Sequence, residues 1–187
     1  MHPALMYRPG GRLSLAELGA ARLDGHVVEV GDAYMPADTV EGADARATSL
    51  AIGIPDRMAA CGPTAAWIHG ARTAPPPVHH VRASGDLRLR PATRLSLVVH
   101  EPGLAAEEGM LIGGLVVASP LFTGMELALG SAAHAEYADW LRDLLLVMPG
   151  LGDPLRQRAA DLPRRPGRRQ ARELLVRLEA GQDVVTR

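Results

Sequence analysis

Two short segments decide most of the expected fold: CGPTAAWIHG at residues 61–70 and GGLVVASPLFTGMELAL at residues 113–129. In the first segment, Pro63 has no N–H group and a preset φ, so it suits the opening of a helix. Residues 64–69 would form that helix, and Gly70 is placed to end it. The segment therefore predicts a short helix that carries Trp67 into the core.

The second segment predicts a hairpin that leads directly into a helix. Gly113-Gly114 supplies the positive φ angles of a two-residue turn between the apolar residues 110–112 and 115–117. Ser119 is a favourable N-cap, and Pro120 follows at the first helical position. We therefore expect an antiparallel strand pair and then a helix, without a long loop between them.

Together with a Pro-rich connection and a Val-His-His-Val strand between them, these segments resemble the AbiEi-type antitoxin family of bacterial type IV toxin-antitoxin systems. The resemblance spans roughly residues 31–178. The residues that carry it are Thr64, Trp67, His69, Gly70, Ser119, Pro120 and Thr123. The family pattern in the second segment is Ser-Pro-x-Arg-Thr-x-x-Asp-Leu-Ala. Here Phe122 stands at the Arg position and Glu126 at the Asp position.

The resemblance implies a DNA-binding repressor of its own operon, built from an N-terminal winged helix and an α/β antitoxin domain. It also implies a functional link to a nucleotidyltransferase-like toxin from a neighbouring gene, which the antitoxin opposes without a stable complex. The motifs themselves are small and apolar, so they specify a scaffold better than an activity.

The start of the chain has the pattern of an incomplete winged helix. Ser14 and Glu17 form a capping box for a short helix, and Gly25 ends it. Residues 26–30 and 33–35 then predict a two-stranded ribbon. We expect residues 1–38 to form a partial winged-helix-like element, and residues 39–187 an AbiEi-like antitoxin α/β domain with a basic helical tail.

The remaining pattern predicts the fold class. A helix is expected at residues 40–52, strands at 57–61, 78–83, 87–89 and 94–100, and helices at 153 onward and 166–180. One apolar stripe recurs with helical spacing: Tyr137, Trp140, Leu141, Leu144, Leu145 and Met148. The expected class is α+β, with a small mixed or antiparallel sheet packed against helices and a helical C-terminal third.

Composition excludes several chemistries. All 20 basic residues are Arg, so a P-loop, a protein kinase or a pyridoxal phosphate enzyme, which need Lys, are excluded. Cys61 is the only cysteine, so neither a disulfide within the chain nor a Cys-based zinc site can form. Without a membrane-spanning apolar run or a signal peptide, we expect a cytoplasmic protein with no membrane contact.

The basic residues are concentrated near the end of the chain. Residues 1–150 carry 11 Arg against 16 acids, whereas residues 151–187 carry 9 Arg against 5. Five of these arginines crowd around an expected helix N-terminus: Arg164, Arg165, Arg168, Arg169 and Arg172. Because positive side chains oppose the helix dipole there, a phosphate would relieve the conflict. We therefore predict contact with duplex DNA through its phosphates, against the alternative of a solvated helix face.

The other candidate groups favour structural roles. His69, His79, His80 and His100 could suggest a metal cluster, but His79 and His80 are neighbours on a strand and must point to opposite faces. The acids Asp86, Glu107 and Glu108 lie in expected loops without a paired His or nucleophile. We expect no catalytic residue, no metal and no cofactor.

These observations predict a non-enzymatic, antitoxin-like transcriptional regulator that contacts DNA and opposes a nucleotidyltransferase-like toxin. The alternative is a protein-interaction scaffold that has lost DNA binding. An enzyme is the third and least favoured alternative. Proteins of the resembling family often continue into a very-short-patch-repair-like nuclease module, and this sequence stops at Arg187, before such a module could start.

Overall fold

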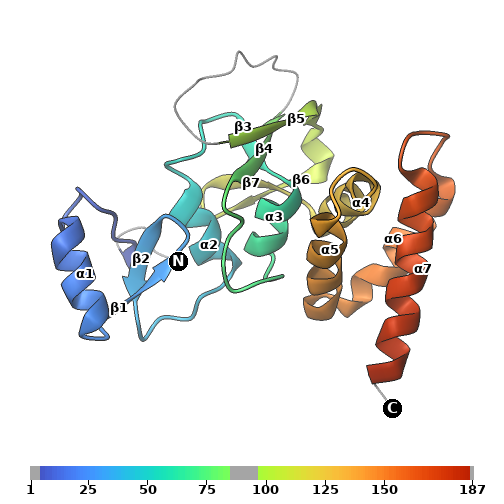
Figure 1. Cartoon of the computed structure of the whole chain (residues 1–187). Helices are drawn as coiled ribbons and strands as arrows, with labels where there is room; N and C mark the ends of the chain where they lie inside the picture. The colour runs from blue at the N-terminus through green and yellow to red at the C-terminus, as the bar shows by residue number, and fades with distance from the viewer. Residues whose placement is uncertain (1–4, 85–96, 186–187) are drawn as a thin grey trace.

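A computed structural model describes residues 5–84 and 97–185 and has the α+β fold that the sequence predicts. Its five-stranded mixed sheet has the strand order β5-β4-β3-β7-β6 and lies in the middle of the molecule (Figure 1). The strands are β3 (Met58–Ala60), β4 (His79–Ser84), β5 (Leu97–Leu104), β6 (Gly109–Ile112) and β7 (Leu115–Ala118). The pairs β3–β7 and β4–β5 are parallel, whereas β3–β4 and β6–β7 are antiparallel.

Helices cover the sheet and form the last third of the described chain. They are α2 (Ala43–Leu50), α3 (Gly62–Ile68), α4 (Pro120–Gly130), α5 (Glu136–Val147), α6 (Gly152–Asp161) and α7 (Arg168–Val185). Short 3₁₀ helices lie at Ala106–Glu108 and Pro149–Leu151. In the part of the chain that the structure describes, no helix is both long and apolar enough to cross a membrane.

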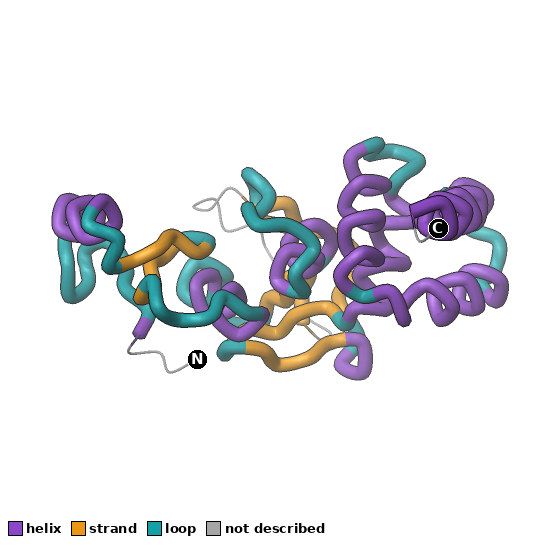
Figure 2. The backbone as a smooth tube through the Cα atoms, turned by 90° about the horizontal axis from the view of Figure 1, so that it is seen from below, coloured by secondary structure: helices purple, strands orange, loops and turns teal. Residues whose placement is uncertain are grey.

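The N-terminal element consists of α1 (Leu15–Leu23) and the ribbon β1 (Val27–Val30) and β2 (Ala33–Pro36). The predicted capping box is confirmed, since the Ser14 side chain accepts from the backbone of Glu17 and the Glu17 carboxylate accepts from the backbone of Ser14. The molecule is elongated, with α1 at one end and α6 and α7 at the other (Figures 1 and 2). Its identity as a partial winged helix stays a prediction.

Several predicted boundaries were wrong by a few residues. The helix expected at 40–52 is Ala43–Leu50, because Gly42 is its N-cap in an extended conformation. The last helix begins at Arg168 rather than at residue 166, because Gly167 has a φ of +78°, which is not helical. The strand expected at 87–89 lies outside the described residues, and so do residues 94–96 of the next one.

The predicted hairpin and helix at residues 110–130 are confirmed. Gly113 and Gly114 have φ angles of +55° and +83°, and β6 pairs with β7 in the expected register. A Cβ at Gly113 would lie 2.5 Å from the carbonyl oxygen of Asp44, so the turn requires glycine for contact with α2 as well. Ser119 caps α4 by accepting from the backbone N–H of Phe122 at 3.3 Å.

Trp67 is the largest fully buried side chain of the core. Its indole N–H donates to the carbonyl oxygen of Thr73 at 3.3 Å, and the guanidinium of Arg46 lies 5.2 Å above its ring. The predicted apolar stripe of α5 is also confirmed, with Met148 only partly buried. Trp67 therefore connects the first motif to the centre of the fold.

Replacing Trp67 with Ala should lower the free energy of unfolding by about 3–5 kcal/mol through the cavity that it leaves. Leu23→Ala is the control, because Leu23 is 84% exposed and should cost less than about 0.5 kcal/mol. Urea denaturation of both variants measures the difference. Equal stability of the two variants would contradict the central role of Trp67.

Candidate functional site

The connection between α6 and α7 carries the arginines that the sequence predicts to bind DNA. Arg164 and Arg165 are exposed, and within the described residues neither guanidinium group has a hydrogen bond or an ion pair. Arg169 is 82% exposed at its side chain and lies 3.7 Å from Glu173. These three guanidinium groups form what we call the basic turn: Arg164, Arg165 and Arg169.

Arg168 and Arg172, which the sequence also predicts to bind DNA, donate to carbonyl groups at the end of α6. Arg172 donates from Nε to the carbonyl oxygen of Ala159 at 2.8 Å and from Nη2 to that of Ala160. Arg168 donates to the same oxygen of Ala160 at 3.3 Å. Carbonyl groups in the last turn of a helix lack partners within it, so both arginines cap α6 and compensate its dipole. Both side chains therefore hold the connection between α6 and α7 against the end of α6.

Two further arginines of the tail are neutralised by acids. Arg156 pairs with Asp153 and with Glu179, the latter at 2.9 Å. Arg158 reaches Glu108, which is distant in the sequence, at 2.5 Å. Arg156 and Arg158 therefore contribute less to the positive charge of the tail than the arginines of the basic turn.

The residues of the family resemblance join α3, β7 and α4. His69 Nε2 and Thr123 Oγ1 both contact the carbonyl oxygen of Ala118, at 2.8 Å and 3.2 Å. Thr64 Oγ1 accepts from the backbone N–H of His80 at 2.8 Å. Thr64, Trp67 and Thr123 are fully buried. These side chains hold α3, β4, β7 and α4 together.

A buried ion pair that the sequence did not predict lies beside this junction. Arg82 on β4 donates two hydrogen bonds to Glu126 on α4, at 2.6 Å and 2.8 Å. The other carboxylate oxygen accepts from the backbone N–H of Gly62 at 2.7 Å. The Arg82 guanidinium also lies 5.5 Å above the ring of Phe122. Arg82 thus pairs with Glu126, the acid of the second motif. In the family that this motif resembles, an Arg occupies the position of Phe122.

A cluster of neutral polar rings lies next to this ion pair. His80 Nδ1 is 2.8 Å from His100 Nε2 and 3.2 Å from the hydroxyl oxygen of Tyr137. Burial and the neighbouring imidazole of His100 lower the pKa of His80 to about 4, and burial lowers the pKa of His100. Burial raises the pKa of Tyr137 to about 12. His79 points to the other face as predicted, 3.7 Å from Asp32.

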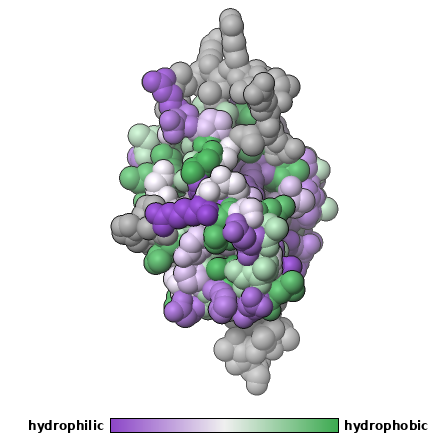
Figure 3. Space-filling view, turned by 90° about the vertical axis from the view of Figure 1, so that its left-hand side faces the viewer, coloured by the Kyte–Doolittle hydropathy of each residue, from purple (hydrophilic) through white to green (hydrophobic). Residues whose placement is uncertain are grey.

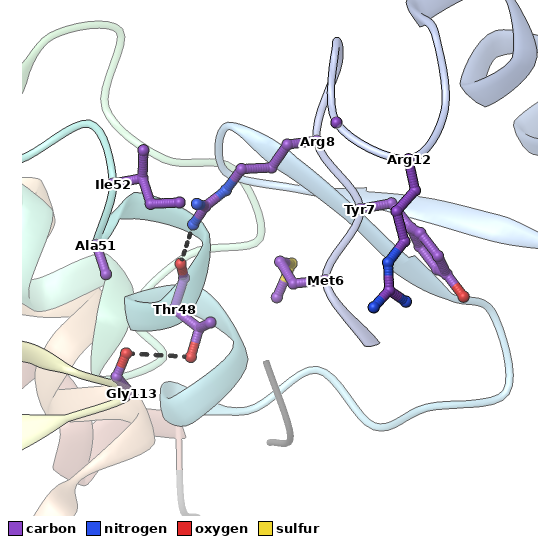
Figure 4. Close-up of a pocket in the computed structure, with 9 residues that line it drawn as sticks. Met6, Tyr7, Arg8, Arg12, Thr48, Ala51, Ile52 and Gly113 are labelled. Carbon is purple, nitrogen blue, oxygen red and sulfur yellow. Dashed lines mark hydrogen bonds between the residues drawn. The ribbon is translucent and has the colours of Figure 1, made fainter. Parts of the chain in front are cut away.

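One cavity opens beside His100 and Tyr137, and another opens beside α2. The first, of about 520 Å³, is lined by residues of β4, β5, α4, α5 and the connection from α6 to α7. The second, of about 430 Å³, lies between the N-terminal segment and α2 (Figure 4). There Arg8 donates to the carbonyl oxygen of Thr48 at 2.6 Å, and Thr48 donates to that of Gly113 at 3.3 Å. These bonds fix the hairpin turn against α2, so we interpret the second cavity as a structural gap.

The described part of the chain shows neither a grouped set of metal ligands nor an activated cysteine nucleophile. No three His, Cys, Asp or Glu side chains there are grouped as a metal site. Cys61 is buried, and burial with the nearby Glu126 raises the pKa of its thiol, which disfavours the reactive thiolate. Glu107 and Glu108 lie in a 3₁₀ helix, and Asp86 lies outside the described residues.

No protein-family model matches this chain, and neither curated proteins nor solved structures give a significant match. The resemblance to AbiEi-type antitoxins therefore depends on the motif residues alone.

Glu126→Gln should lower the free energy of unfolding by about 3–5 kcal/mol, because it leaves the guanidinium of Arg82 buried without a counter-charge. The side chains of Arg82 and Glu126 are only 11% and 8% exposed. The double variant Arg82→Met, Glu126→Leu should recover most of this loss. Denaturant unfolding of the single and double variants tests the coupling, and independent, additive effects would contradict it.

Acidification should destabilise the protein through His80 and His100. Their pKa values lie below the unfolded value of about 6.5. Between about pH 4 and pH 6.5 the unfolded chain therefore binds more protons, and the free energy of unfolding falls as the pH falls. His80→Gln should flatten this slope. Urea denaturation at several pH values measures it, and identical slopes in both proteins would contradict the assignment.

Proposed function

We propose that this protein is a non-enzymatic, antitoxin-like regulator that contacts duplex DNA through the basic turn. The observation that carries the proposal is the set of three guanidinium groups, Arg164, Arg165 and Arg169, that are not held in close ion pairs. Arginine forks suit phosphate oxygens, and their positive charge next to a helix N-terminus favours an anion there. The capping of α6 by Arg168 and Arg172 supports a turn of fixed shape.

The charge of the N-terminal element argues against DNA contact at the opposite end of the molecule. Residues 1–38 carry three Arg against five acids. Arg22 of α1 also lies 3.7 Å from Glu29 of β1. The face that carries α1 mixes apolar with hydrophilic side chains (Figure 3), and Leu15 and Leu23 of this helix are exposed. A net negative element repels phosphates, which favours the basic turn as the contact.

The proposed contact is with the backbone of the duplex rather than with stacked bases. Trp67, Trp140 and Tyr137 are buried in the core, so they are not available as stacking platforms. Phosphate contacts carry no sequence information directly. We therefore propose binding that is weak, tolerant of sequence and strongly dependent on salt.

The antitoxin role depends on the resemblance described above, which links such proteins to a nucleotidyltransferase-like toxin. Co-expression with the product of a neighbouring nucleotidyltransferase gene tests this part separately from DNA binding. Restored growth would support neutralisation, and growth arrest despite soluble expression of both proteins would argue for a scaffold without antitoxin activity.

The DNA proposal predicts a steep salt dependence. The slope of log K against log salt should be about −0.9 per phosphate neutralised, and replacing the three arginines of the basic turn with Ala should reduce its magnitude by up to about 2.7. The thermal midpoint should stay near that of the wild type, because these side chains are exposed. Titration of a labelled duplex at three salt concentrations measures the slope.

A matched control distinguishes a local DNA contact at the basic turn from an effect of the protein's total charge on DNA affinity. Arg12, Arg22 and Arg142 are exposed arginines elsewhere, so replacing these three with Ala removes the same charge without touching the basic turn. The control should keep most of the wild-type slope. Absence of wild-type binding at about 50 mM salt, where phosphate contacts are strong, would favour the interaction scaffold instead.

A further inference from the structure

The larger cavity has the composition of a small-molecule site. Its volume of about 520 Å³ falls within the range of about 300–1,000 Å³ that is typical of ligand pockets. Its apolar lining comes from α4 and the connection between α6 and α7, and includes Phe122, Met125, Leu129, Leu162 and Pro166. The rings of His100 and Tyr137 also line it. Apolar and aromatic walls with a few converging polar groups are characteristic of binding sites.

One polar group of the wall, the hydroxyl of Tyr137, has a single hydrogen-bond partner in the described part of the chain, which it shares with His100. Tyr137 and His100 both approach the Nδ1 atom of His80, which has either one proton or one lone pair and can form only one well-directed bond. The contact with His100, at 2.8 Å, is shorter than that with Tyr137, at 3.2 Å. The Tyr137 hydroxyl has no other hydrogen-bond partner among the described residues. An acceptor in the cavity can therefore compete with His80 for the proton of this hydroxyl.

The charges of the wall leave one cation available. Arg82 is paired with Glu126, and Arg158 with Glu108. Arg165 lines the cavity and has no ion pair within the described residues. Glu101, on β5, is the one lining carboxylate without an ion pair there, and it is exposed. An anion beside Arg165 would gain a charge-assisted bond and would be opposed only by Glu101.

We propose that this cavity binds a small aromatic anion, with its planar body among Phe122, Leu129 and Leu162 and its anionic oxygen atoms bound by Arg165 and the Tyr137 hydroxyl. The shared chemistry is a flat apolar group that carries a carboxylate or a phosphate. A cation is disfavoured, because the guanidinium of Arg165 faces the site without an acid paired to it among the described residues. Binding at this site can be measured in the absence of DNA, although Arg165 belongs to both surfaces.

The experiment uses naphthyl phosphate and naphthoate as probes, titrated calorimetrically into the purified full chain without DNA. At least one probe should bind with a saturable one-to-one isotherm, and comparison of the two distinguishes phosphate from carboxylate. The neutral analogue naphthalenemethanol should bind at least about tenfold more weakly, because it lacks the charge-assisted bond.

Three substitutions should each change the affinity for the probe in a direction that a non-specific apolar pocket would not reproduce. Arg165→Gln should weaken binding by about tenfold or more, and Tyr137→Phe by about three- to tenfold. Glu101→Gln should tighten binding, by up to about fivefold, because it removes a like charge. The matched controls are Arg142→Gln and Tyr34→Phe, which lie outside the cavity and should leave the affinity unchanged.

Several outcomes would overturn the proposal. They are the absence of saturable binding of both probes, equal affinity for the neutral analogue, an unchanged affinity in Arg165→Gln, or weaker binding in Glu101→Gln. Because Arg165 and Glu101 are exposed, their variants should fold even where Tyr137→Phe loses stability. DNA binding plays no part in these measurements, so their failure leaves the proposed regulator function standing.

Discussion

The carboxylate of Glu126 is the constraint on which the centre of this fold depends. It lies on α4, binds the guanidinium of Arg82 on β4, and accepts from the backbone N–H of Gly62 at the start of α3. Arg82 also donates to the carbonyl oxygen of Pro102 on β5. One buried charge therefore connects two helices with two strands. Because an unpaired charge is costly in the interior, these elements can separate only if the whole ion pair is exposed to water.

The sequence predicted the features whose physical cause is local. The capping box of Ser14 and Glu17, the Gly113-Gly114 turn and the Ser119 cap each involve residues close in the chain. The apolar stripe of α5 is likewise a matter of spacing within one helix. These local patterns specify the same structure in any fold that buries the expected face. The sequence therefore predicts them without knowledge of the strand order in the sheet.

The sequence could not predict the contacts that depend on the sheet. Arg82 and Glu126 are 44 residues apart, and His80 and His100 are 20 apart on parallel strands whose register no local pattern determines. The partners of the tail arginines could not be predicted for the same reason. Counting Arg against nearby acids omits Glu108, which neutralises Arg158, and the carbonyl groups of α6, which bind Arg172. Tertiary partners of this kind separate the arginines that build the fold from those that remain available.

Arg165 belongs both to the basic turn and to the wall of the larger cavity, so the two proposed ligands are not independent of each other. A guanidinium has five donors but a single positive charge, and two anions placed beside it repel each other. An aromatic anion in the cavity should therefore weaken phosphate contact at the turn. By thermodynamic linkage, DNA should weaken binding of the aromatic anion by the same factor. Because Arg168 and Arg172 hold the turn against α6, this coupling requires no rearrangement of the fold and acts through charge alone.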